Sequence, residues 1–91
     1  MDQLNTIQEL INQGRVEEAL QALDQYLTTE TTNKDTAYYL KGNAYRKLGN
    51  WQQALNNYQL ATELNPDSPA KEARAMVMEI LNFYHKDMYN Q

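Results

Sequence analysis

The sequence predicts an all-α domain in which five antiparallel helices form a right-handed solenoid of helical hairpins. Apolar residues recur at three- and four-residue spacings along the 91-residue chain, and no window shows the alternation of a strand. Three glycines and two prolines are the only strong breaks in this pattern. The pattern also repeats: aligning Gly14 with Gly49 (49 − 14 = 35) brings residues of the same class into register. A repeat of this length with two helices is typical of a helical solenoid.

Composition limits the function classes that remain open. Twelve Asp and Glu against eight Lys and Arg give a net charge of −4, whereas a nucleic-acid binder needs a clustered basic excess. Cysteine is absent, which excludes disulfides, thiolate-bound zinc and Cys nucleophiles. No stretch approaches the roughly 20 apolar residues of a membrane-spanning helix, and the N-terminus lacks a secretory signal pattern. We therefore expect a cytoplasmic protein with no cofactor, no metal, and neither a membrane nor a nucleic acid as partner.

The first repeat is expected over residues 2–34. Its first amphipathic helix ends near Gly14 and has apolar side chains at Leu4, Ile7, Leu10 and Ile11. Its second helix has its apolar and small residues at Ala19, Leu20, Leu23, Tyr26 and Leu27. Glu17 and Glu18 lie near the positive N-terminal end of that helix, which favours helix formation. The polar residues 28–35 are expected to connect the two repeats.

The second repeat is expected over residues 35–68. Its first helix is predicted over residues 36–48, with Asn33 and Asp35 as candidate N-caps. The side chains expected to point inward or partly inward from it are Ala37, Leu40, Ala44, Tyr45 and Leu48. Gly49 and Asn50 suit the left-handed backbone that ends helices. The following helix carries Trp51, Ala54, Leu55, Tyr58, Ala61 and Thr62 at helical spacing and is closed by Pro66.

A long last helix is expected over residues 69–89, with Ser68 as its N-cap and Pro69 at its first position. Its inward stripe is Ala70, Ala73, Val77, Ile80, Leu81, Tyr84 and Met88. The opposite side is polar and charged, which predicts a terminal capping helix. Met76 and Phe83 lie on one shoulder of the inward stripe, and two interpretations remain open. Either both are buried at the edge of a wide stripe, or they form an exposed apolar patch, together with Tyr89, for self-association.

The segment from Tyr38 to Pro66 resembles a tetratricopeptide repeat. The residues that carry the resemblance are Tyr38, Gly42, Tyr45, Ala54, Tyr58, Ala61 and Pro66. Lys41 departs from the family pattern, which usually has leucine there. The first repeat matches less well, because Ile7 and Tyr26 stand where small residues belong. The resemblance implies one domain spanning residues 1–91, with two repeats followed by a capping helix.

The resemblance also implies a non-enzymatic protein–protein interaction module. In this family a peptide or partner segment usually lies in the concave groove lined by the first helix of each repeat. The matching positions here are Gln8, Asn12, Tyr39, Asn43, Arg46 and Lys47. The two cations suit an acidic partner, and the Asn43 amide suits a peptide backbone. The alternative for this site is that these residues are only solvated helix faces.

Two other functions are alternatives to a binding module. The first is a structural homo-oligomer, such as a homodimer, which associates through the apolar shoulder of the last helix. The second is an enzyme, for which the sequence contains few candidate catalytic residues. His85 has no carboxylate or second histidine three or four residues away, and Ser68 is better explained as an N-cap than as a nucleophile.

Overall fold

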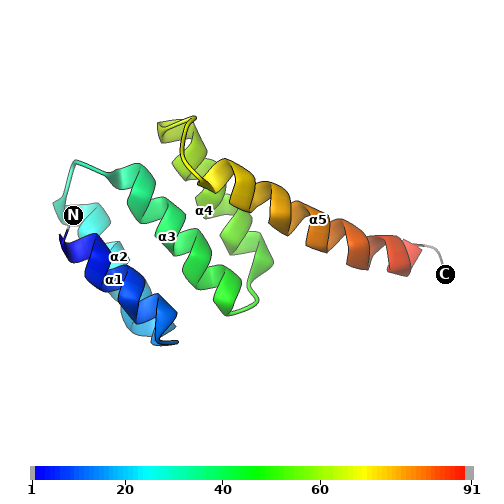
Figure 1. Ribbon diagram of the computed structural model, residues 1–91, viewed down its shortest axis with the longest axis horizontal. Coiled ribbons are helices and arrows are strands. Elements are labelled where there is room, and N and C mark those ends of the chain that lie inside the picture. Colours follow the sequence, from blue (N-terminus) through cyan, green and yellow to red (C-terminus); the bar gives the residue numbers. More distant parts are fainter. Residues whose placement is uncertain (1, 90–91) are drawn as a thin grey trace.

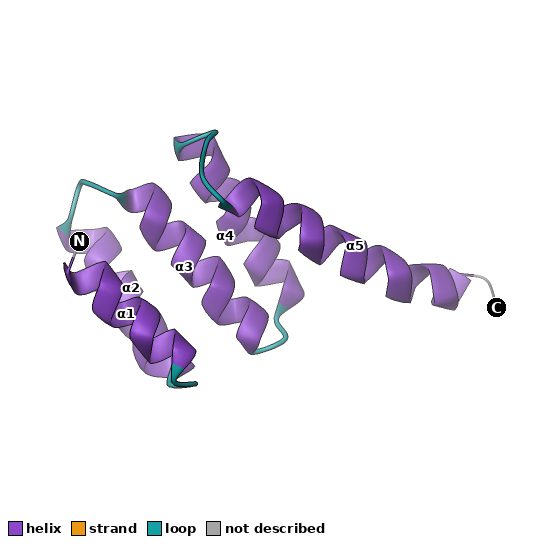
Figure 2. Cartoon of the chain, in the orientation of Figure 1, coloured by secondary structure: helices purple, strands orange, loops and turns teal. Residues whose placement is uncertain are grey.

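A computed structural model describes the backbone of residues 2–89 and the side chains of residues 3–83. Its helices are α1 (Asp2–Asn12), α2 (Val16–Thr29), α3 (Lys34–Lys47), α4 (Trp51–Leu64) and α5 (Ala70–Tyr89). Short loops join them, and residues 2–89 contain no strand (Figure 2). The α1/α2 and α3/α4 hairpins stand side by side, and α5 crosses α4 and projects beyond it (Figure 1). The predicted all-α hairpin fold is confirmed.

Helix α3 joins the two hairpins. It packs against α4 within its own hairpin and against both α1 and α2 of the preceding one, while α5 packs against α4. The core therefore has two parts, one between α1, α2 and α3 and one between α4, α5 and the tyrosines of α3. Tyr39 packs against both parts, so a single α3 side chain connects them.

The turns inside the two hairpins have the same hydrogen bonds, 35 residues apart. Gly14 and Gly49 have φ angles of 83° and 76°, in the left-handed region that glycine adopts without a steric penalty. The N–H of Arg15 donates to Leu10 O and the N–H of Asn50 donates to Tyr45 O, both at 2.9 Å. This pairing is the Schellman motif, which satisfies carbonyls at a helix end. Each hairpin thus has its own turn, and the two turns have the same backbone conformation.

Small residues permit the helices of each hairpin to approach. Ala19 and Ala54 occupy equivalent positions and both are 0% exposed, as the internal repeat predicts. At Gly42 the approach is closer still. A Cβ added there would overlap Cδ1 and Cε1 of the Tyr58 ring and lie 3.0 Å from its Cζ. Only glycine leaves room for this ring between α3 and α4.

Two expectations for the second repeat are wrong. Asp35 does not cap α3; it lies in the first turn, and its Oδ2 accepts a hydrogen bond from Asn65 Nδ2 at 3.0 Å. Asn33 does hold the N-cap position, with a φ of 56° and no side-chain capping bond. Leu48 does not point inward but is 51% exposed, because it follows the last helical residue of α3. The Asp35–Asn65 bond instead ties the start of α3 to the end of α4.

Lys41, the departure from the family pattern, has a structural role. Its Nζ lies 2.9 Å from Asp24 Oδ1 on α2, and its side chain is only 18% exposed. A lysine with so little of its side chain exposed benefits from such a partner, because removing a charge from water is costly unless it is paired. The pair therefore links the second hairpin to the first where leucine would supply only apolar contact.

Helix α5 closes the second part of the core. Ser68 Oγ accepts a hydrogen bond from the N–H of Ala70 at 3.1 Å, so the predicted N-cap is present. Ala70, Ala73 and Val77 are buried against α4, and Leu81 packs partly against them. The opposite side is exposed at Lys71, Glu72, Ala75, Glu79 and Asn82, as expected for a terminal helix. The Tyr84, Lys86 and Met88 side chains lie outside the described residues.

Within the described part of the chain, no helix is long and apolar enough to cross a membrane.

Replacing Gly42 by alanine is expected to destabilise the protein. The added methyl group must displace the buried Tyr58 ring, which typically costs about 1–3 kcal/mol. This cost exceeds the gain of about 1 kcal/mol that alanine brings to a helix interior. Thermal or urea unfolding measures the difference.

The control is Gln52→Ala on the exposed side of α4, where a change within about 0.5 kcal/mol is expected. Equal stability of the Gly42→Ala variant and the wild type would contradict close packing at this position.

Candidate functional site

A groove lies between α1 and α3 and reaches the first residue of α4. Its hollow measures about 390 Å³ and is lined by Gln8, Ile11, Asn12, Leu40, Asn43, Arg46, Lys47 and Trp51. Five of the six groove residues expected from the sequence therefore surround one hollow. Tyr39 is the exception: it is half-buried, with its ring centroid 6.0 Å from that of Tyr58. Tyr39 thus packs in the core beside Tyr58 and does not line the groove.

The groove has an apolar floor and a polar rim. Ile11 and Leu40 are buried, and Trp51 is partly exposed beside them. The sequence predicts these three residues on apolar helix faces but does not connect them with the groove. Trp51 reaches the groove through the Gly49 turn, which returns the chain so that Trp51 stands beside the end of α3. Gln8, Asn12 and Lys47 form the exposed rim.

One polar contact links the groove to the core. The hydroxyl of Tyr58, on α4, donates a hydrogen bond to Asn43 Oδ1, on α3, at 2.5 Å. This bond occupies an acceptor position of the Asn43 amide and leaves its NH₂ group to donate to a ligand. Asn43 is therefore held in one orientation by a side chain that is itself buried.

Tyr58 is also affected by Arg46. Burial raises the pKa of the Tyr58 hydroxyl, while the hydrogen bond and positive charge of Arg46 lower it in part. The Arg46 guanidinium therefore lies close to the Tyr58 hydroxyl. Arg46 and Lys47 also occupy the last turn of α3, where cations interact favourably with the helix dipole.

The groove is positively charged in a protein of net charge −4. Its lining contains Arg46 and Lys47 and no acidic side chain. Neither cation forms an ion pair with any acidic residue whose side chain the structure describes. Two adjacent cations above an apolar floor favour a carboxylate that comes with an apolar neighbour.

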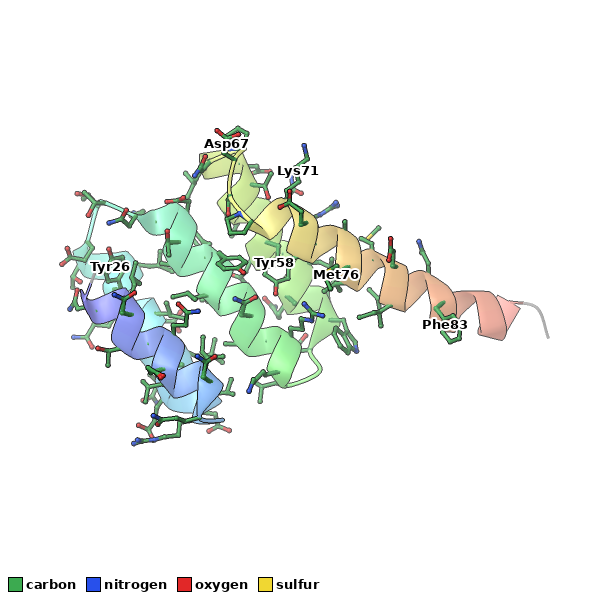
Figure 3. The ribbon with its side chains drawn as sticks, in the orientation of Figure 1. Tyr26, Tyr58, Asp67, Lys71, Met76 and Phe83 are labelled. Carbon is green, nitrogen blue, oxygen red and sulfur yellow. The ribbon has the colours of Figure 1, made fainter. Side chains whose placement is uncertain are left out.

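A second exposed feature lies on α5. Met76 is 52% exposed and Phe83 is 64% exposed, so the interpretation that both are buried is wrong (Figure 3). Together with Glu79 and Ile80 they line a shallow hollow on one side of the helix. We call this set, Met76, Glu79, Ile80 and Phe83, the α5 face. Tyr89, the third residue expected in the patch, lies outside the described side chains.

A third hollow, of about 320 Å³, lies between α1 and α2. Its lining is Gln3, Thr6, Ile7, Leu10, Ala22, Gln25, Tyr26 and Thr29, none of which is charged. Among the described side chains there is no group of three His, Asp or Glu residues that would hold a metal ion. His85 lies outside that range. The α1/α3 groove thus differs from the other hollows described in having two cations, and no acidic side chain, beside its apolar residues.

Comparisons with known proteins agree with this architecture. A family model described as tetratricopeptide repeat matches residues 36–68, which include most of α3 and all of α4. The chain is also similar to the solution NMR structure of the Bacteroides fragilis protein BF1650, with 75% identity and a TM-score of 0.90. The alignment covers 100% of this chain and 92% of that one. A search of curated proteins found no match.

Replacing Tyr58 by phenylalanine tests the contact beneath the groove. The variant loses the hydrogen bond to Asn43, which is typically worth about 1 kcal/mol. The raised pKa of Tyr58 means that the folded protein holds this proton more tightly than the unfolded chain. Its contribution to stability is therefore complete below about pH 10 and lost as the pH rises further.

Unfolding free energies measured between about pH 8 and pH 11 are expected to fall less steeply for the Tyr58→Phe variant than for the wild type. Parallel curves for the two proteins would contradict burial of the Tyr58 hydroxyl.

Proposed function

Because the chain belongs to the tetratricopeptide repeat family, whose members generally mediate protein–protein interaction, we propose that its α1/α3 groove binds a segment of a protein partner. The observation that carries the proposal is that Arg46 and Lys47 lie above an apolar floor and form no ion pair with a described acidic side chain. The function is binding without catalysis, since the lining offers cations, amides and apolar surface.

Each part of the groove has a role in this proposal. Arg46 and Lys47 bind a carboxylate of the partner through charge-assisted hydrogen bonds. The floor of Ile11, Leu40 and Trp51 receives an apolar side chain next to that carboxylate. The Asn43 NH₂ group donates to a backbone carbonyl, in the orientation that Tyr58 imposes. The preferred partner is therefore an acidic segment with an apolar anchor.

The groove is small, and this limits its affinity. Stable protein–protein interfaces bury about 800 Å² on each partner, which is more than two short helices offer. Ordering the partner segment costs further free energy. Micromolar or weaker binding is expected for an isolated peptide.

A peptide-library screen tests the groove. The triple variant Asn43→Ala, Arg46→Ala, Lys47→Ala removes the Asn43 amide and both cations and is expected to lose most of the peptides that the wild type captures. Those peptides should be enriched in Asp and Glu beside apolar residues.

The matched control is Lys34→Ala, Asn56→Ala, Lys71→Ala, which likewise removes one amide and two cations, all away from the groove. It is expected to bind like the wild type. Equal capture by the groove variant and the wild type would contradict peptide binding in the groove.

Self-association through α5 is a second candidate function, favoured by the exposure of Met76 and Phe83. Apolar side chains this exposed are typical of interaction surfaces when they lie together. Sedimentation of the wild type and a Met76→Ser, Phe83→Ser variant tests this candidate. Association of the wild type that the variant reduces is the expected result, and equal behaviour of the two would contradict it.

A further inference from the structure

We propose that the occupant of the α1/α3 groove is helix α5 of a second copy of this chain. The contact uses the α5 face, Met76, Glu79, Ile80 and Phe83. This inference rests on the proposed binding function of the groove and names its partner. It joins the two exposed features of the molecule into one interface.

The α5 face has the spacing of a helix that binds in a groove. Relative to Met76, the other three residues stand at i+3, i+4 and i+7, the positions that anchor an amphipathic helix in a hydrophobic groove. All four line the same hollow, so they share one side of α5. The face therefore presents three apolar side chains around one carboxylate.

Helix α5 is placed where another molecule can reach it. Of its described residues, Ala70, Ala73 and Val77 are buried against the rest of the chain, and all three lie in its first half. The second half projects past α4, and Phe83 lies on this part (Figures 1 and 3). Most helical stability in proteins comes from packing of an apolar face. A partner surface against the projecting half would therefore stabilise α5 as well as hold the complex.

The groove and the α5 face are complementary in charge and polarity. The groove has Arg46 and Lys47 beside an apolar floor, and the face has Glu79 among apolar residues, with Glu72 about two turns before Glu79. Neither glutamate forms an ion pair with a described side chain. Opposite charges across an interface steer association and fix its register.

Charge also favours this contact over other contacts through which two copies could associate. Pairing of two α5 faces would bring Glu79 close to its own copy, and like charges oppose association. The hollow between α1 and α2 has no charged side chain to match Glu79. A hollow beside the Gly14 turn has one cation, Arg15, but this residue is paired with Glu18 at 2.7 Å. The α1/α3 groove has two cations and no acidic side chain in its lining, so its charge complements this face.

The contact must form between molecules. Helix α5 packs on α4 and runs away from α1, so it cannot return to the groove of its own chain (Figure 1). Every copy carries one groove and one α5 face. Two copies can therefore exchange their α5 helices reciprocally in a dimer, or successive copies can join head to tail.

Charge reversal at exposed positions tests the inference. Lys47→Glu changes the groove, Glu79→Lys changes the α5 face, and Lys71→Glu on another side of α5 is the control. All three positions are exposed, and circular dichroism verifies that each variant is folded. Sedimentation between about 10 μM and 1 mM covers the weak affinity expected of a small interface.

The wild type and the Lys71→Glu control are expected to associate as concentration rises. Lys47→Glu and Glu79→Lys should each lower the association constant about threefold or more, since each replaces an attraction by a repulsion. An equimolar mixture of these two variants should associate more strongly than either alone. In the mixture, an unchanged groove meets an unchanged α5 face, and the reversed charges attract one another.

Three results would overturn the inference. They are a wild type that stays monomeric throughout, a loss of association with Glu79→Lys but not with Lys47→Glu, and a mixture no stronger than its components. A monomeric wild type that still captures acidic peptides through the groove would retain the proposed function while excluding α5 as the occupant.

Discussion

The arrangement of this domain depends on the contact between the Tyr58 ring and the backbone at Gly42. The ring fills the space that a side chain at Gly42 would need, so α3 and α4 approach more closely there than any other residue would permit. The same ring carries the hydroxyl that orients Asn43 and interacts with Arg46. Tyr39 packs beside it at an interplanar angle of 38°. Core packing and the orientation of the groove side chains therefore share one cause.

The first hairpin has the same geometry, but its large and small side chains are distributed differently between its two helices. Ile7 stands at the position of Gly42 and Leu23 at that of Tyr58 (42 − 35 = 7; 58 − 35 = 23), and both are buried. A larger residue on the first helix thus accompanies a smaller one on the second, and such compensation is tolerated in cores when total volume is kept. Tyr26 stands at the position of Ala61, and its hydroxyl donates to Thr32 O at 2.9 Å. The first repeat has fewer motif residues but the same turn, in keeping with a family match confined to residues 36–68.

The helices and turns could be predicted because they depend on residues close together in the sequence. The contacts between helices could not be predicted in this way. Gly14 and Gly49 have roles set by their own backbone, Ser68 has one set by a hydrogen bond two residues away, and all three were predicted correctly. Asp35 was misassigned because its partner, Asn65, is distant in sequence. The rim of the groove followed from the family resemblance, but its floor required knowing how α1, α3 and the start of α4 are arranged. The exposure of Met76 and Phe83 could not be predicted, because it depends on where α4 ends beneath α5.

The Gly42–Tyr58 contact is open to direct observation by solution NMR. The Gly42 α protons lie against the Tyr58 ring, so they should show nuclear Overhauser effects to its δ and ε protons and a ring-current shift. The ring-current shift should disappear in a Tyr58→Leu variant. Ordinary helical shifts for the Gly42 α protons in the wild type, without Overhauser effects to Tyr58, would contradict the packing on which the groove depends.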